Sequence, residues 1–345
     1  MYIGLEILEG TESLVWRELD KILGPRKVTK AFQNLILIAT DDMTRDVVLI
    51  SLFSRAITNV YVVPHYGRYN TTDELYKISM TIPWHEIFEP DKSFAVTTKI
   101  LPQKLDRKTI GRLVGQGVVD RFRAEIGSRP PVNLKSPDIE ITSFINECYV
   151  AFGIKLFDKN MNSPEEISNR LVILGLESYR VSSVGEIYHT GVCESAFEFF
   201  NLEPLKDRLL ESIFIELKII DKEKILKLAT QKWKRKSANI TCFVENFDPK
   251  YKPAYGEINQ HLISEIPTTP IDTFLTNLVL AFPSKKSQQA AVSKIQEYLA
   301  QNNQWTQTSL LIRSDIKINT IFKAKKLVEI SVKGIPSQLL LITRR

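Results

Sequence analysis

The residues best suited to chemistry lie between positions 99 and 131, where cationic side chains, glycines and prolines are interleaved. An apolar stripe at helical spacing predicts a helix over about 107–125, preceded by a strand that ends near Leu101. Cations and an amide on the other side of this helix, and just outside it, are the groups that hold a phosphate backbone. The residues predicted to contact phosphates are Lys104, Arg107, Lys108, Arg112, Gln116, Arg123 and Arg129.

Three glycines interrupt the predicted helix, at Gly111, Gly115 and Gly117. Each costs about 1 kcal/mol of helix stability relative to alanine, so their presence needs a reason. One interpretation is that the helix backbone approaches a polyanion closely. The other is that the glycines let the helix pack against its own protein, with the basic side chains merely solvated. The periodicity alone leaves the two interpretations equally supported.

Other reaction chemistry is weakly indicated. Cys148, Cys193 and Cys242 are far apart and form no CxxC pattern, so neither a disulfide framework nor a zinc site is predicted. The four histidines are isolated, and the sequence contains neither HExxH nor a glycine-rich phosphate loop. A second basic run, KWKRK at 232–236, is a further candidate for RNA contact or an ordinary solvated helix end.

Length and composition describe an ordinary globular chain of about two domains. The chain has 345 residues, 43% of them hydrophobic and 25% charged, with a net charge of +6 and a pI near 9.0. This mildly basic balance is compatible with nucleic acid without being diagnostic of it. No signal peptide or membrane-spanning run is apparent, so a cytoplasmic protein without membrane contact is expected.

The element pattern predicts an α+β N-terminal half and an α/β C-terminal half. Residues 1–64 show the β-α-β-β-α-β order of a ferredoxin-like domain, and 65–157 form a second α+β unit that contains the basic helix. Residues 158–184 are predicted to link these units to 185–345. In that last part strands and helices alternate before a terminal hairpin, which predicts a doubly wound, Rossmann-like sheet.

The first half resembles the ferredoxin-like and THUMP module of THUMP-containing RNA guanine-N2 methyltransferases, which modify rRNA or tRNA. The matching stretches are GTESLVWRELDKILG at 10–24, LISLFSRAITNVYV at 49–62, DELYKISMTIPWHEIF at 73–88, FAVTTKI at 94–100 and VVDRFRAEIGSRPPVNLKSPDIEI at 118–141. Their order and spacing, rather than any single one, carry the resemblance. It implies that the module holds structured RNA, tRNA or rRNA rather than DNA, and it favours the RNA interpretation of the basic helix.

The second half resembles the family's methyltransferase domain in element order and in the linker GLESYRVSSV at 175–184. Such domains bind S-adenosylmethionine at a turn written roughly Asp-Pro-x-x-Gly-x-Gly-Thr, whose glycines admit the cofactor. Two alignments are open, at 203–206 and at 210–213, and neither contains glycine. Glu211, in the second alignment, and Glu245, with Asp248 beside it, are weak candidates for cofactor contact.

The family's catalytic loop, Asn-Pro-Pro-Tyr, is also incomplete. The predicted strand carries Asp272 and Asn277, the weak catalytic candidates, but Leu278 follows in place of proline. We therefore expect an RNA-binding protein with a degenerate methyltransferase domain and no cofactor, which recruits RNA or acts as the inactive partner of an active methyltransferase subunit. The alternative is a guanine-N2 methyltransferase that uses S-adenosylmethionine through a divergent site. A third reading, a fold kept for protein–protein contacts, predicts no RNA affinity.

Overall fold

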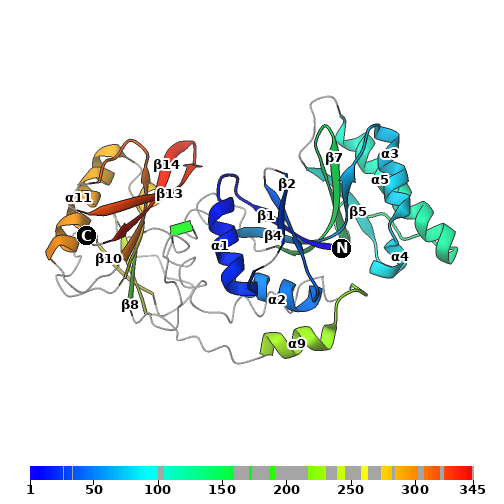
Figure 1. The fold of residues 1–345 in the computed structure, drawn as a ribbon, viewed down its shortest axis with the longest axis horizontal. Coiled ribbons are helices and arrows are strands. Elements are labelled where there is room, and N and C mark those ends of the chain that lie inside the picture. Colours follow the sequence, from blue (N-terminus) through cyan, green and yellow to red (C-terminus); the bar gives the residue numbers. More distant parts are fainter. Residues whose placement is uncertain are drawn as a thin grey trace. The chain divides into compact units, whose positions relative to one another are not determined.

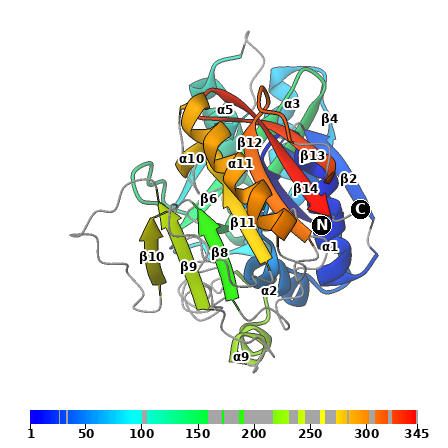
Figure 2. The ribbon, with the colours of Figure 1, turned by 90° about the vertical axis from the view of Figure 1, so that its left-hand side faces the viewer.

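The structure, a computed structural model, describes residues 1–25, 27–32, 34–99, 105–158, 171–172, 186–190, 217–230, 239–244, 258–262, 273–281, 284–301, 307–318 and 322–343. The chain forms two compact units. The first holds most of residues 1–159 together with 206–231, and the second holds most of the remainder. Each unit contains one seven-stranded sheet (Figures 1 and 2).

The N-terminal unit is built on a mixed sheet in the order β2-β3-β1-β4-β7-β6-β5. Its strands are β1 (Tyr2–Ile7), β2 (Val28–Phe32), β3 (Leu35–Ala39), β4 (Ile57–Arg68), β5 (Phe94–Lys99), β6 (Ile139–Ile145) and β7 (Tyr149–Asp158). Its helices are α2 (Met43–Phe53), α3 (Thr72–Thr81), α4 (Trp84–Ile87) and α5 (Arg107–Ile126). Helix α1 (Glu12–Leu23) is divided, because its residues up to Glu18 are grouped with the second unit. All strand pairs are antiparallel except β5 with β6.

Strand β4 joins the two parts of this unit into one sheet. Its first half pairs with β1, and along most of its length it pairs with β7. The domain limit expected between residues 64 and 65 lies inside this strand. The predicted β-α-β-β-α-β order is present, but β4 runs past residue 64 to Arg68, because β7 of the unit that contains α5 pairs with it.

Local signals in the sequence explain where the helix that carries the basic residues begins and ends. The Asp106 carboxylate accepts a hydrogen bond from the Thr109 backbone N–H at 2.9 Å and so caps the first turn of α5. Gly127 ends the helix with a left-handed backbone at φ 72°, which a residue with a Cβ rarely adopts. The helix predicted from periodicity is confirmed to within a residue at each end.

The second sheet has the order β10-β9-β8-β11-β12-β14-β13. Its strands are β8 (Glu186–Thr190), β9 (Asn239–Val244), β10 (Ile258–Leu262), β11 (Thr273–Asn277), β12 (Gln307–Arg313), β13 (Lys323–Val332) and β14 (Ile335–Thr343). Helices α10 (Leu278–Ala281) and α11 (Lys285–Gln301) follow β11. Neighbouring strands from β10 to β12 are parallel, and β14 pairs antiparallel with both β12 and β13.

This order is that of a doubly wound sheet whose direction of winding reverses between β8 and β11. The predicted α/β class and terminal hairpin are confirmed. Strands β8 and β10 have no clear pattern in the sequence. A helical pattern at 193–202 and a strand-like pattern at 208–215 fall outside the described residues.

We expect the stability of the N-terminal unit to fall below about pH 6.5 because of His65. Burial lowers the pKa of His65 from its ordinary value of 6.5, and its Nε2 has no hydrogen-bond partner among the described residues. The unfolded chain then binds the proton first, so stability is full above the unfolded pKa and declines as pH falls through it. Urea unfolding at pH 7.5 and 5.5 should show a larger loss for wild type than for His65→Phe, which keeps the contact with Phe152. Equal losses would contradict this.

Candidate nucleic-acid interface

Three exposed cations lie on the first two turns of α5. Arg107, Lys108 and Arg112 are exposed, and within the described ranges none of them makes an ion pair. The hydrogen bonds from Thr109 hold the pKa of Asp106 below its ordinary value, so the cap stays anionic at neutral pH. The three cations face solvent, and only the charge of the Asp106 cap, which interacts with Lys108, offsets them locally, so the first turns of α5 offer a basic surface to a phosphate. Lys104, the fourth predicted residue here, lies outside the described residues.

The other predicted residues on α5 are engaged within the helix. Gln116 donates to Asp120 Oδ1 at 2.8 Å, and Arg123 pairs with the same oxygen at 3.4 Å. The Tyr76 hydroxyl of α3 donates to the other oxygen of Asp120 at 3.1 Å. This carboxylate partly neutralises its surroundings, so Gln116 and Arg123 are less available to a phosphate than the first three cations.

Arg129 lies on a chain segment whose backbone is fixed. It is exposed and follows the Gly127 cap. Two residues further on, the Pro131 carbonyl accepts from Phe94 N–H at 2.9 Å, and Asn133 N–H donates to Phe94 O at 3.0 Å. The exit of α5 is therefore held against the edge of β5, and Arg129 is presented from a defined position.

Lys99 begins the basic stretch but faces another part of the protein. Its ammonium group donates to both oxygens of Glu6, at 2.9 and 2.8 Å, and to the Tyr61 hydroxyl at 3.2 Å. The Asn59 amide donates to the same carboxylate at 2.8 Å. Lys99 thus links β5 to β1 and β4 and is not part of the free basic surface.

The glycines of α5 face the protein itself, which decides between the two interpretations of them. A Cβ at Gly117 would lie 2.6 Å from the Ser79 Cβ and 2.9 Å from the Tyr76 carbonyl, both in α3. A Cβ at Gly115 would meet Val96 and Phe94 of β5 only at 3.7 and 3.9 Å. Gly117 is needed for the close packing of two helices, whereas Gly115 is not needed sterically.

A matched pair of substitutions tests this difference. We expect Gly117→Ala to lower the free energy of unfolding by about 1–3 kcal/mol, because α3 must shift to admit the methyl group. Gly115→Ala should leave stability unchanged or raise it by up to about 1 kcal/mol through helix propensity. Urea denaturation followed by circular dichroism measures both, and equal effects would show that the packing contact is not the reason for Gly117.

Two large side chains in the stretches that match the THUMP-containing methyltransferases have structural roles. Trp84 is fully buried, and its indole N–H donates to the Ser79 carbonyl at 2.9 Å, so it packs within the fold. Arg55 is 1% exposed and donates to the Leu52 carbonyl at 3.2 Å. Neither side chain is available to stack on or contact a nucleic acid.

The second candidate site is the carboxyl edge of the second sheet, where its winding reverses. Thr276 of β11 lies beside Thr190 of β8, so the end of β11 at Asn277 is adjacent to the end of the first strand. The chain after β8 begins at Gly191, and both alignments considered for the cofactor turn lie further along. Asp272, Glu211 and Glu245 lie outside the described residues.

The segment after Asn277 turns into the core. Leu278 is fully buried in the core cluster beneath α11, and Val279 is 2% exposed. The buried Gln288 amide donates to the Leu278 carbonyl at 3.1 Å, and its Oε1 accepts from Arg313 N–H at 2.7 Å. These hydrogen bonds fix α10 against α11 and β12. The Leu278 carbonyl is therefore already hydrogen-bonded within the protein.

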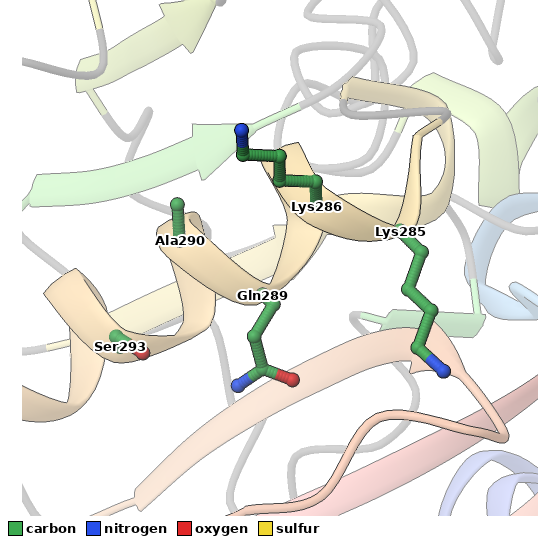
Figure 3. Close-up of a pocket in the computed structure, with 5 residues that line it drawn as sticks. All are labelled: Lys285, Lys286, Gln289, Ala290 and Ser293. Atoms are coloured by element: carbon green, nitrogen blue, oxygen red, sulfur yellow. The ribbon is translucent and has the colours of Figure 1, made fainter.

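A shallow, open depression runs along the outer face of α11, as Figure 3 shows. It is lined by Lys285, Lys286, Gln289, Ala290 and Ser293. Lys285 pairs with Asp315 at 3.1 Å. Nothing in this lining resembles a cofactor cradle. Within the described part of the chain, no group of acidic, histidine or cysteine side chains fits a metal ion, and no helix has the length and apolar character to cross a bilayer.

Comparison with known proteins agrees with this arrangement. Residues 69–152 match the THUMP domain family. Over 133 residues, 38% of this chain, the sequence is 32% identical to "Ribosomal RNA large subunit methyltransferase K/L" of Buchnera aphidicola subsp. Acyrthosiphon pisum. The match spans only 18% of that relative's length.

Solved structures with the same fold cover the whole chain. A possible methylase from Clostridium difficile superposes with a TM-score of 0.75 at 14% identity, covering 100% of this chain and 98% of that one. A putative methyltransferase complexed with SAH gives 0.74, with the same identity and coverages. At this identity the likeness establishes the fold alone. Residues 69–152 therefore form a THUMP domain, and the chain shares its fold with solved structures described as a possible methylase and a putative methyltransferase.

Proposed function

We propose that this protein binds structured RNA, tRNA or rRNA, through the basic face of α5, and that its own second unit transfers no methyl group. The observation that carries the proposal is the set of three exposed cations, Arg107, Lys108 and Arg112, without an ion-pair partner in the described structure, inside a THUMP domain. On this proposal, residues 1–64 and 65–157 supply the RNA-binding module, and 185–345 form a degenerate methyltransferase domain that recruits RNA or assists an active methyltransferase subunit.

The residues after β8 do not fit S-adenosylmethionine, the cofactor that the fold implies. Because β8 ends at Thr190, the pattern Asp-Pro-x-x-Gly-x-Gly-Thr falls on Thr190-Gly191-Val192-Cys193-Glu194-Ser195-Ala196-Phe197. Glu194 and Ala196 stand where the two glycines belong. In the family pattern the glycines leave the space that the cofactor fills, so a side chain at either position would take up part of that space, and the Glu194 carboxylate would add a negative charge there.

The catalytic loop supports the same conclusion. In the family, prolines after the Asn hold a backbone carbonyl toward the target base. In this chain Leu278 and Val279 are buried, and the Leu278 carbonyl accepts from Gln288. Asn277 alone remains of the motif at the end of β11, and one amide does not make a methyl-transfer site.

The competing proposal is an S-adenosylmethionine-dependent guanine-N2 RNA methyltransferase with a divergent site that uses Asn277 and Asp272. It is favoured by the name of the homologues and by the fold, which is similar to that of a putative methyltransferase complexed with SAH. The overlap with the homologues covers less than half of this chain, so this support is indirect.

One experiment separates the two proposals. We expect filter binding of unmodified tRNA and rRNA fragments to show affinity that falls steeply with salt, while calorimetric titration with S-adenosylmethionine shows no heat of binding up to millimolar concentration. Micromolar binding of the cofactor would establish the competing proposal. Absence of RNA binding at low salt would overturn the proposal of an RNA-binding protein. The remaining alternative would be a fold kept for protein–protein contacts.

A further inference from the structure

A segment from the C-terminal half of the chain is seated on the N-terminal unit. Residues 217–230, which include α9 (Lys222–Thr230), lie in the chain between β8 and β9, two neighbouring strands of the second sheet. They belong to the N-terminal unit, where α9 packs on α2 (Figure 1). From the sequence this helix is expected within residues 185–345. Part of the connection between β8 and β9 therefore belongs to the unit that carries the THUMP domain.

Lys218 fixes the start of the segment beside α4. Its backbone N–H donates to the Ile87 carbonyl at 2.9 Å, and its ammonium group donates to the His85 carbonyl at 3.0 Å. The same ammonium group pairs with Glu89 at 3.0 Å. Both side chains of that ion pair are substantially exposed, 37% and 52%. This end is thus held by backbone contacts together with an ion pair that salt can screen.

The helix itself is held against the start of α2. Asp221 N–H donates to the Thr44 hydroxyl at 3.0 Å, and the Lys224 ammonium group pairs with Asp42. Burial raises the pKa of Asp42, but the hydrogen bonds and charges of Lys224 and Arg45 outweigh it and hold the pKa below its ordinary value. The carboxylate is therefore charged at neutral pH. Lys224 and Asp42 are 38% and 34% exposed, so this pair is also open to screening.

Few apolar side chains support these polar contacts. Among the described side chains of this segment, Leu217, Ile220 and Ile225 are buried, Leu228 is half-buried and Leu226 is 52% exposed. Three buried side chains are a small gain against the conformational entropy of ordering fourteen residues. A nine-residue helix does not persist alone in water, so α9 must lose its helical structure when it leaves α2.

We propose that residues 217–230 act as a reversible clasp, which folds only when docked on α2 and α4 and unfolds when the ion pairs of Lys218 and Lys224 are screened or removed. The clasp holds part of the connection between β8 and β9 on the N-terminal unit. The clasp does not depend on RNA or cofactor binding, because its contacts are made only between residues 217–230 and the region of α2 and α4.

Hydrogen–deuterium exchange of the full chain tests the clasp. Amides of 221–230 in wild type should exchange more slowly than in an unfolded peptide of the same sequence. Raising KCl from 0.05 to 0.5 M should accelerate them by about tenfold, because two partly exposed ion pairs are screened. A salt-independent rate in wild type would overturn the proposal without any variant.

A charge-matched pair of variants locates the effect. Lys224→Glu places a like charge against Asp42 and should accelerate exchange of 221–230 by at least tenfold at low salt, with little remaining salt dependence. Lys222→Glu makes the same change at an exposed position of the same helix and should leave the wild-type rates unchanged. Exchange in the rest of α2 reports whether the fold is intact. If both variants accelerate exchange equally, or neither does, the ion pair does not hold the segment.

Discussion

Reversing the charges of Arg107, Lys108 and Arg112 to glutamate should lower the affinity for structured RNA by roughly 100-fold or more at 0.1 M salt. Each side chain that contacts a phosphate contributes about one released counterion, so the slope of log K against log salt should also decrease by about 2–3. All three residues are exposed, which predicts unchanged circular dichroism and thermal stability. Filter binding or fluorescence anisotropy over a range of salt concentrations measures both quantities.

A charge-matched control lies in the second unit. Lys286, Lys317 and Lys323 are exposed, and their reversal changes the net charge by the same amount. If both triple variants lose affinity equally, binding depends on total charge and not on the face of α5. If the α5 variant unfolds, the three cations are structural, and the interface assignment is wrong.

The double substitution Leu278→Pro with Val279→Pro writes the family's Asn-Pro-Pro into residues 277–279, and we expect it to destabilise the second unit rather than to create activity. Both side chains are buried, and loss of Leu278 alone removes a fully buried member of the core cluster. Core truncations of this kind cost about 2–5 kcal/mol each, which is a large part of the stability of a domain. Thermal unfolding should show the loss, and no binding of S-adenosylmethionine should appear.

Its control is the double substitution Lys285→Pro with Lys286→Pro in the first turn of α11. Both lysines are exposed, and proline is accepted in the first turn of a helix, so the loss should be below about 1 kcal/mol. The double variant at 278 and 279 could instead keep wild-type stability and bind the methyl donor. That result would show that the segment accepts the catalytic-loop conformation, and it would support the competing proposal.

Local chemistry was sufficient to predict the elements whose signals lie within them. The helix α5 was predictable because an apolar stripe, an acidic cap at Asp106 and a stop at Gly127 all act within one stretch. Strands β8 and β10 gave no such signal: EIYHT and INQHL are short, mixed in polarity and without alternation. Their place in the sheet comes from neighbouring strands that are distant in sequence.

Sequence alone was also insufficient to assign partners. Nothing near Lys99 indicates that its charge is taken by Glu6, because the two residues meet only when β5 and β1 enter the same sheet. The orientation of Gly117 toward Ser79 likewise depends on how α3 packs on α5. The same limit applies to α9, whose amphipathic pattern predicts a helix but not the unit on which it docks.

The shared strand β4 has a practical consequence for dissecting the molecule. The THUMP match starts at residue 69, immediately after β4 ends at Arg68, yet β4 is the neighbour that pairs with β7 along most of its length. A fragment excised at that limit would carry β7 as a bare edge, with Phe152 and Ile154 stripped of their partner strand. Exposed edges of this kind pair with other chains, so the excised piece should self-associate. A fragment that keeps β1 to β4 leaves β7 paired with β4 and should stay monomeric.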